Sequence, residues 1–132
     1  MMAGRQLKRM LCVEDDTDIQ AVATLALEMV GGLTVRVCSS GTEAVAAATA
    51  FAPDCVLLDV MMPGMDGPAT LAALRADAAT AHIPVIFMTA KVQSSEVEQL
   101  RALGAIGVIA KPFDPMSLAA EVRALFEAER PA

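Results

Sequence analysis

Five short apolar runs, separated by segments with helical periodicity, constrain the fold of this chain more than any other feature. Runs of this length, rich in Val, Ile and Leu, are typical of strands that are buried on both faces. Strands that alternate with helices along a whole chain favour parallel βα units, and right-handed crossovers place the helices on both faces of one sheet. The sequence therefore predicts an α/β fold with strands at Leu7–Val13, Leu33–Cys38, Cys55–Leu58, Ile83–Met88 and Val108–Ala110.

The segments between these runs carry signals for helix ends. Ser40 followed by Glu43 predicts a capping box at one helix start. Pro68 suits the first residue of a helix, and Asp114-Pro115 predicts the start of the last helix. We expect helices over about 17–30, 40–50, 68–75, 94–103 and 114–129.

Length, composition and charge indicate one domain that binds neither nucleic acid nor membranes. The chain has 132 residues, 55% of them hydrophobic, which suits a single domain over 1–132 with a core over about 8–128. Its net charge is -6 and it contains no Trp or Tyr and no run of Lys or Arg, so we expect no contact with DNA or RNA. No apolar run is long enough to span a membrane and no apolar signal core follows the N-terminus, so we expect a soluble, cytoplasmic protein.

Three cysteines, Cys12, Cys38 and Cys55, lie in apolar stretches that are predicted strands or their edges. Their number is odd and no CxxC spacing is present, so neither a metal site nor a redox motif is indicated. We expect three reduced, buried thiols.

Polar and charged side chains follow four of the five predicted strands. Ligands of an open parallel sheet bind beyond the carboxyl ends of its strands, so we expect these side chains to meet at one edge. They are Glu14, Asp15 and Asp16 after the first strand, Asp59 after the third, Thr89 after the fourth and Lys111 after the fifth.

Carboxylates crowded at one edge repel one another unless a cation neutralises them. Hard oxygen ligands at this density suit Mg²⁺, and Lys111 supplies an ammonium group that can reach a carboxylate or a phosphoryl oxygen. A carboxylate beside both cations can attack a phosphorus centre, so Asp59 is the predicted site of an aspartyl phosphate.

Taken singly, each of these residues has an ordinary structural explanation. Asp59 would serve as a loop or helix-cap residue, Thr89 as a turn cap and Lys111 as a surface lysine. The acidic residues 14–16 would form a solvated turn that favours the following helix dipole. Their coincidence at the ends of four strands favours a shared site instead.

Four spaced motifs stand at these strand ends: Val13-Glu14-Asp15-Asp16, the run from Leu57 to Gly67, Met88-Thr89-Ala90, and Lys111-Pro112-Phe113. Together they resemble the motif set of bacterial response-regulator receiver domains of the single-domain, chemotaxis-regulator type. The resemblance covers about 8–126, nearly the whole chain. It implies a flavodoxin-like, doubly wound five-stranded parallel sheet of order 2-1-3-4-5.

The resemblance implies a set of ligands for Mg²⁺. Asp15 resembles the carboxylate that binds the ion directly, and Glu14 the one that holds it through water. Asp59 and the main-chain carbonyl of Met61 resemble the remaining protein ligands.

The resemblance also implies how the phosphoryl group is held. Asp59 resembles the phosphoacceptor, and Lys111 the lysine that pairs with the acceptor or its phosphoryl group. Thr89 resembles the hydroxyl that turns inward to bond a phosphoryl oxygen. Ala90 is small, as access to the acceptor requires, and the Lys111-Pro112 peptide is expected to be cis.

Two positions depart from the family pattern. Relatives often carry an aromatic residue where this chain has Val108, and the rotation of that ring reports phosphorylation. Relatives also often carry acidic residues at the position of Ile106-Gly107. These apolar replacements favour either tighter core packing or a hydrophobic docking face, and the sequence leaves both readings open.

The function that the resemblance implies is a stand-alone response regulator of a two-component system or phosphorelay. A histidine kinase or phosphotransfer protein would donate the phosphoryl group. The phosphorylated form would bind a downstream protein through the face from the fourth to the fifth helix, or pass the group on. We expect a monomer or weak dimer that catalyses only its own phosphorylation and dephosphorylation.

Three other functions compete with this one. A haloacid-dehalogenase type phosphatase needs a second acid two residues after its nucleophile, where this chain has Met61. A flavin or nucleotide binder needs a phosphate-cradling first loop, and the acidic residues 14–18 would repel phosphate. An adaptor that is never phosphorylated does not need Asp59, Thr89 and Lys111 together.

Overall fold

The computed structural model describes residues 6–129, and the ends of the predicted 1–132 domain lie outside them. A parallel sheet of five strands forms the centre of the molecule, in the order β2-β1-β3-β4-β5. The predicted strand order is thus confirmed. The strands are β1 (Arg9–Val13), β2 (Thr34–Cys38), β3 (Cys55–Asp59), β4 (Val85–Thr89) and β5 (Gly107–Ala110).

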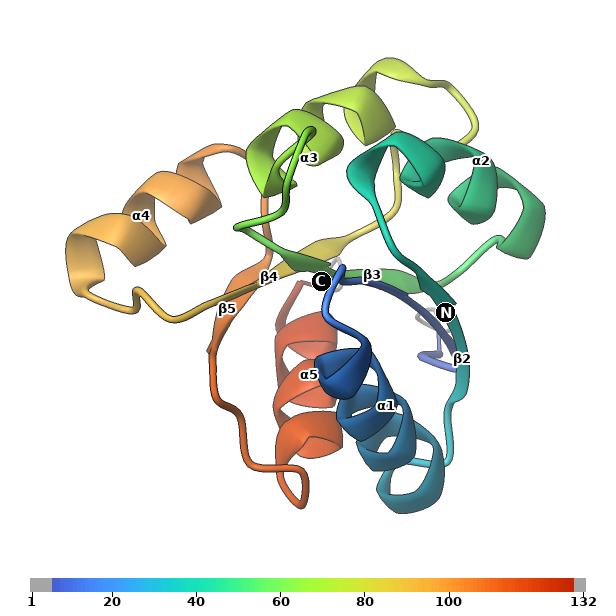
Figure 1. Cartoon of the computed structure of the whole chain (residues 1–132), viewed down its shortest axis with the longest axis vertical. Helices are drawn as coiled ribbons and strands as arrows, with labels where there is room; N and C mark the ends of the chain where they lie inside the picture. Colours follow the sequence, from blue (N-terminus) through green and yellow to red (C-terminus); the bar gives the residue numbers. More distant parts are fainter. Residues whose placement is uncertain (1–5, 130–132) are drawn as a thin grey trace, which may run out of the picture.

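Helices cover both faces of the sheet (Figure 1). One face carries α1 and α5, and the other carries α2, α3 and α4. Within the described residues, none of the helices has the length and apolar character that crossing a bilayer requires. Their bounds are α1 (Thr17–Leu25), continued by the π-helical η1 (Ala26–Val30), α2 (Gly41–Phe51), α3 (Gly67–Ala76), α4 (Ser94–Ala102) and α5 (Leu118–Ala128).

The core lies in two layers because successive strand residues point to opposite faces. In β1, Met10 and Cys12 pack toward α1 and α5, while Leu11 and Val13 pack toward α2 and α3. Every residue of β3 and β4 is buried, which is why these strands read as continuous apolar runs.

One predicted capping box does not form, and one predicted helix start is wrong. Ser40 is the N-cap of α2 but makes no capping bond, because its hydroxyl donates to the Glu43 carboxylate at 2.7 Å. The last helix begins at Leu118 rather than at Asp114. Asp114 instead closes a turn, accepting from the main-chain N–H of Met116 at 2.8 Å and of Leu118 at 3.0 Å.

Packing explains the apolar replacements at the start of β5. Ile106 and Gly107 are buried, and a Cβ on Gly107 would lie 2.5 Å from Leu125 of α5. Val108 is partly buried and packs on the core layer under α2 and α3. The structure therefore supports the core-packing reading of these positions.

All three cysteines are buried and none forms a disulfide, as expected. Burial raises the pKa of Cys12 from 9.0 to about 12, and nearby Glu14 adds to the rise. Burial likewise raises the pKa of Cys38 to about 11, with a further contribution from Glu43. Cys12 and Cys38 are therefore almost entirely thiols, not thiolates, in the folded protein.

We expect Cys12 and Cys38 to resist a thiolate-specific disulfide reagent at pH 8. A rise from 9.0 to about 12 lowers the thiolate fraction of Cys12 by roughly 10³ at this pH. Reaction kinetics with and without guanidinium chloride test this, since unfolding should release both thiols. Equal rates in the two conditions would show that the buried sites open readily.

At Gly41, α2 lies close against Thr70 of α3. A Cβ there would collide with the Thr70 hydroxyl and lie 2.9 Å from the carbonyl oxygen of Met65. We expect Gly41→Ala to lower the free energy of unfolding by about 1–3 kcal/mol, because overpacking exceeds the helix-propensity gain of at most ~1 kcal/mol. Urea unfolding measures this, with Thr42→Ala on the exposed side of the same turn expected to change it by under ~0.5 kcal/mol.

Candidate functional site

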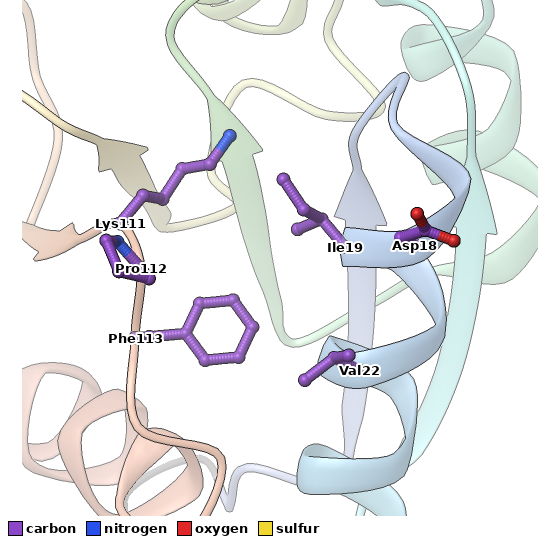
Figure 2. A pocket seen from close by; sticks show the side chains of 6 residues that line it. All are labelled: Asp18, Ile19, Val22, Lys111, Pro112 and Phe113. Atoms are coloured by element: carbon purple, nitrogen blue, oxygen red, sulfur yellow. The ribbon is translucent and has the colours of Figure 1, made fainter.

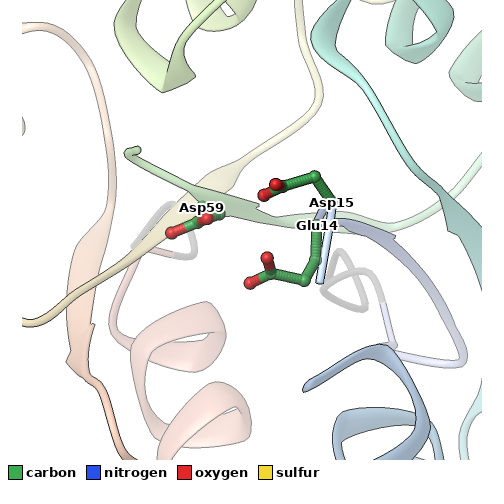
Figure 3. A group of neighbouring side chains, drawn as sticks. All are labelled: Glu14, Asp15 and Asp59. Carbon is green, nitrogen blue, oxygen red and sulfur yellow. The ribbon is translucent and has the colours of Figure 1, made fainter. Parts of the chain in front are cut away.

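Three carboxylates meet at the carboxyl ends of the two central strands (Figure 3). Glu14 and Asp15 follow β1, and Asp59 is the last residue of β3. Each offers an oxygen within 4.8 Å of the others. Glu14 and Asp59 are only 1% and 3% exposed, whereas Asp15 is exposed. The structure thus brings together the acidic residues that the sequence predicted, with one exception.

Asp16, the exception, is engaged by α1. Its Oδ1 accepts from the main-chain N–H groups of Asp18 at 2.8 Å and Ile19 at 3.2 Å, which makes it the N-cap of the helix. Its own N–H donates to Glu14 Oε2 at 3.0 Å. The carboxylate of Asp16 therefore caps α1 and does not join the acidic cluster.

Lys111 lies between two of these carboxylates. Its Nζ is 3.1 Å from Glu14 Oε1 and 3.0 Å from Asp59 Oδ1. Its main-chain N–H donates to Thr89 O at 2.9 Å, and its peptide bond to Pro112 is cis, as the resemblance implied. One ammonium group from the end of β5 therefore bridges the ends of β1 and β3.

The protonation of this cluster follows from burial and these contacts. Burial raises the pKa of Glu14, opposed by the hydrogen bonds from Asp16 and Lys111 and assisted by the charge of Asp59. Burial lowers the pKa of Lys111, but its bonds to Asp59 and Glu14 outweigh this and leave it raised. Lys111 consequently remains an ammonium ion at neutral pH.

Thr89 ends β4 next to this cluster. It is 5% exposed, and its Oγ1 accepts from the main-chain N–H of Lys91 at 3.0 Å. In the sheet register, Asp59 pairs with Met88, so Thr89 lies one residue beyond the partner of Asp59. The hydroxyl proton remains available for an acceptor in the site.

The loop from β3 to α3 approaches Asp59 closely. The N–H of Gly67 donates to Val60 O at 2.9 Å, and a Cβ on Gly67 would lie 2.6 Å from Asp59 O. Gly67, and not Pro68, is the first residue of α3. Met61, in the same loop, has a side chain that is 71% exposed.

Two residues that support the site were missed in the sequence. Gly67 allows the start of α3 to approach the main chain of Asp59 closely. A glycine in a loop rich in turn residues does not by itself indicate such a close contact. Gln20, on α1, donates from Nε2 to the main-chain oxygen of Glu14 at 2.5 Å. No sequence pattern indicates a bond between a helix side chain and a carbonyl in the preceding loop.

An apolar pocket of about 410 Å³ borders the site. It lies between α1 and the segment after β5, and Figure 2 shows the ring of Phe113 facing Ile19 and Val22 across it. Lys111 contributes its stem to the pocket, while its ammonium group turns to the carboxylates.

The bridge made by Lys111 predicts a stability effect. We expect Lys111→Met to lower the free energy of unfolding in EDTA by roughly 1–3 kcal/mol, because two buried carboxylates lose their counter-charge. This is below the ~3–5 kcal/mol of a fully buried pair, since the Lys111 side chain is 19% exposed. Denaturant unfolding at pH 7 measures it, with exposed Lys91→Met as the control. Equal losses in both variants would contradict the bridge.

A family model described as the response regulator receiver domain matches residues 10–123. Among curated proteins, the DNA-binding response regulator MtrA of Mycobacterium tuberculosis is 39% identical over 117 residues, which are 89% of this chain and 50% of that protein. The phosphate regulon transcriptional regulatory protein PhoB of Pseudomonas aeruginosa is 34% identical over 124 residues, 94% of this chain and 54% of that protein. The chain spans about half the length of these relatives.

Solved structures agree with this match. The chemotaxis protein CheY4 of Vibrio cholerae is 27% identical with a TM-score of 0.82, over 91% of this chain and 99% of that one. A putative response regulator from Chloroflexus aurantiacus is 30% identical with a TM-score of 0.82, over 92% and 99%. Because the family model, the curated relatives and the solved structures all match over most of its length, the chain belongs to the response-regulator receiver family of two-component signalling.

Proposed function

We propose that this receiver domain accepts a phosphoryl group on Asp59 with Mg²⁺ bound beside it, and that the phosphorylated form changes its binding to other proteins. The observation that carries the proposal is the Lys111 ammonium group, which lies 3.0 Å from Asp59 and 3.1 Å from Glu14. The site thus places a carboxylate that can accept a phosphoryl group beside a cation that can neutralise its charge.

The donor set of the site fits a hard divalent cation. Glu14, Asp15 and Asp59 offer only carboxylate oxygens, within 4.8 Å of one another. Lys111 compensates one of three negative charges, and the two that remain match the charge of one Mg²⁺ ion. Asp15 and Asp59 would hold the ion with the carbonyl of Met61, and Glu14 would hold it through water. When bound, the ion supplies positive charge for the phosphoryl oxygens.

The carboxylate of Asp59 is arranged to act as a nucleophile. Lys111 holds Oδ1, and in the described part of the chain no donor is bonded to Oδ2. No buried side-chain polar atom there lacks a partner, so Oδ2 retains access to the surface. With a phosphohistidine donor, an O–P bond forms at Oδ2 as the N–P bond breaks, and the electron pair returns to the imidazole of the donor.

The proposed switch uses the hydroxyl of Thr89. It would leave the N–H of Lys91 and donate to a phosphoryl oxygen, which moves the loop between β4 and α4. Val108 offers no aromatic ring to rotate, so this loop would carry the signal to the face from α4 to α5. A downstream protein would read that face, or the phosphoryl group would pass to another phosphotransfer protein.

The proposed partners and reaction class follow from the same chemistry. A histidine kinase or phosphotransfer protein supplies the phosphoryl group, and the domain acts on itself rather than turning over a substrate. The residue two after Asp59 is Met61, so the second acid of a haloacid-dehalogenase phosphatase is missing. DNA binding is named for MtrA; a net charge of -6 and the lack of a basic run argue against it for these residues.

Acetyl phosphate, with and without Mg²⁺, tests the proposal in a phosphate-affinity gel. We expect a shifted band of the wild-type protein only when Mg²⁺ is present. The Asp59→Asn variant should give no shifted band in either condition. Asp66→Asn is the matched control, because Asn retains the N-cap that Asp66 provides for Ala69 at 2.9 Å.

The possible results separate the competing functions. Labelling of Asp59→Asn at the wild-type rate would move the acceptor to another residue. No shift of a folded wild-type protein would favour an adaptor that is never phosphorylated. Steady hydrolysis of small phosphate esters would favour the phosphatase.

A further inference from the structure

Gln20, a half-buried residue of α1, contacts the acidic loop after β1. Its Nε2 donates to the main-chain oxygen of Glu14 at 2.5 Å and to the hydroxyl oxygen of Ser39 at 3.2 Å. A primary amide nitrogen carries two N–H groups, so both donors are used. Gln20 therefore ties the acidic loop to the segment that follows β2.

The carbonyl that Gln20 binds belongs to the peptide group between Glu14 and Asp15. A peptide group is planar, so a bond that fixes its oxygen also fixes the position of the next Cα atom. The N–H of Glu14 donates to Cys38 O at 3.1 Å, which fixes the preceding peptide as well. The N–H of Asp16 donates to Glu14 Oε2 at 3.0 Å, which holds the following peptide. Together these bonds set the direction in which the side chain of Asp15 leaves the main chain.

The position of the Asp15 carboxylate depends on the main chain more than that of the Glu14 carboxylate does. Lys111 holds Oε1 of Glu14, and the N–H of Asp16 holds Oε2. Asp15 is exposed, and within residues 6–129 no hydrogen bond or ion pair holds its carboxylate. Its place within 4.8 Å of the other carboxylates therefore rests on the peptide that Gln20 fixes.

We propose that Gln20 is a positioning residue for the divalent cation: its amide orients the Glu14–Asp15 peptide and so keeps the Asp15 carboxylate beside Asp59. This inference rests on the metal site of the proposed function. Gln20 would touch neither the ion nor the phosphoryl group. It would raise cation affinity because a ligand already in place loses less freedom on binding.

The affinity of the unphosphorylated full chain for Mn²⁺, an ion visible by electron paramagnetic resonance, tests the proposal. Gln20→Met keeps the length of the side chain and removes both donors, and we expect about 10-fold weaker Mn²⁺ binding. Ser39→Ala removes only the second partner of the amide, so a loss of roughly two- to threefold is expected. Gln99→Met, the same substitution at an exposed position of α4, should bind Mn²⁺ as the wild type does.

Thermal unfolding in EDTA distinguishes positioning from a merely structural role. A structural role would lower the unfolding midpoint of Gln20→Met and leave its Mn²⁺ affinity unchanged, which would overturn the proposal. Weaker Mn²⁺ binding with a midpoint close to that of Gln99→Met would support it.

Asp15→Asn separates the failure of this inference from the failure of the metal site. If Asp15→Asn loses Mn²⁺ binding but Gln20→Met does not, the metal site stands and the positioning role falls. If the wild type and Asp15→Asn bind Mn²⁺ equally, or neither binds it, the metal site fails and the role of Gln20 fails with it.

Discussion

The ammonium group of Lys111 holds two buried carboxylates together, and the arrangement of the site depends on this bridge. Glu14 and Asp59 are almost fully removed from solvent, where an uncompensated carboxylate is costly. The compensating charge comes from the end of β5, and β4 lies between β5 and the strand that carries Asp59. The strand order therefore decides whether the bridge can form, and the long stem of Lys111 allows its charge to reach across β4.

The sequence predicted most of this site because a parallel sheet has a simple geometry. Its strands all end at the same edge, so locating the apolar runs was enough to bring Asp59, Thr89 and Lys111 together. The roles of the adjacent acids Asp15 and Asp16 could not be separated in this way. Both are exposed carboxylates with the same chemistry, and only the backbone after β1 decides that Asp16 caps α1 while Asp15 joins the cluster.

The errors in the predicted fold have a similar cause. A turn residue such as Asp114 and a helix cap accept the same main-chain N–H groups, so the pattern alone does not say whether a helix or a single turn follows. At Gly107 the sequence could not choose between a docking face and tight packing, because that depends on the distance between β5 and α5. Leu125 settles the choice by occupying the space that a side chain at Gly107 would need.

The polar groups of the site differ in how firmly they are held, and this difference fits a switch. Glu14 is fixed at its N–H, its carbonyl and both carboxylate oxygens, whereas the hydroxyl of Thr89 is restrained by one bond to the N–H of Lys91. Breaking one neutral hydrogen bond costs about 1 kcal/mol, and a bond to a charged phosphoryl oxygen contributes about 1.5–3 kcal/mol. If Asp59 accepts a phosphoryl group as proposed, the balance favours movement of Thr89 and leaves the acidic cluster in place.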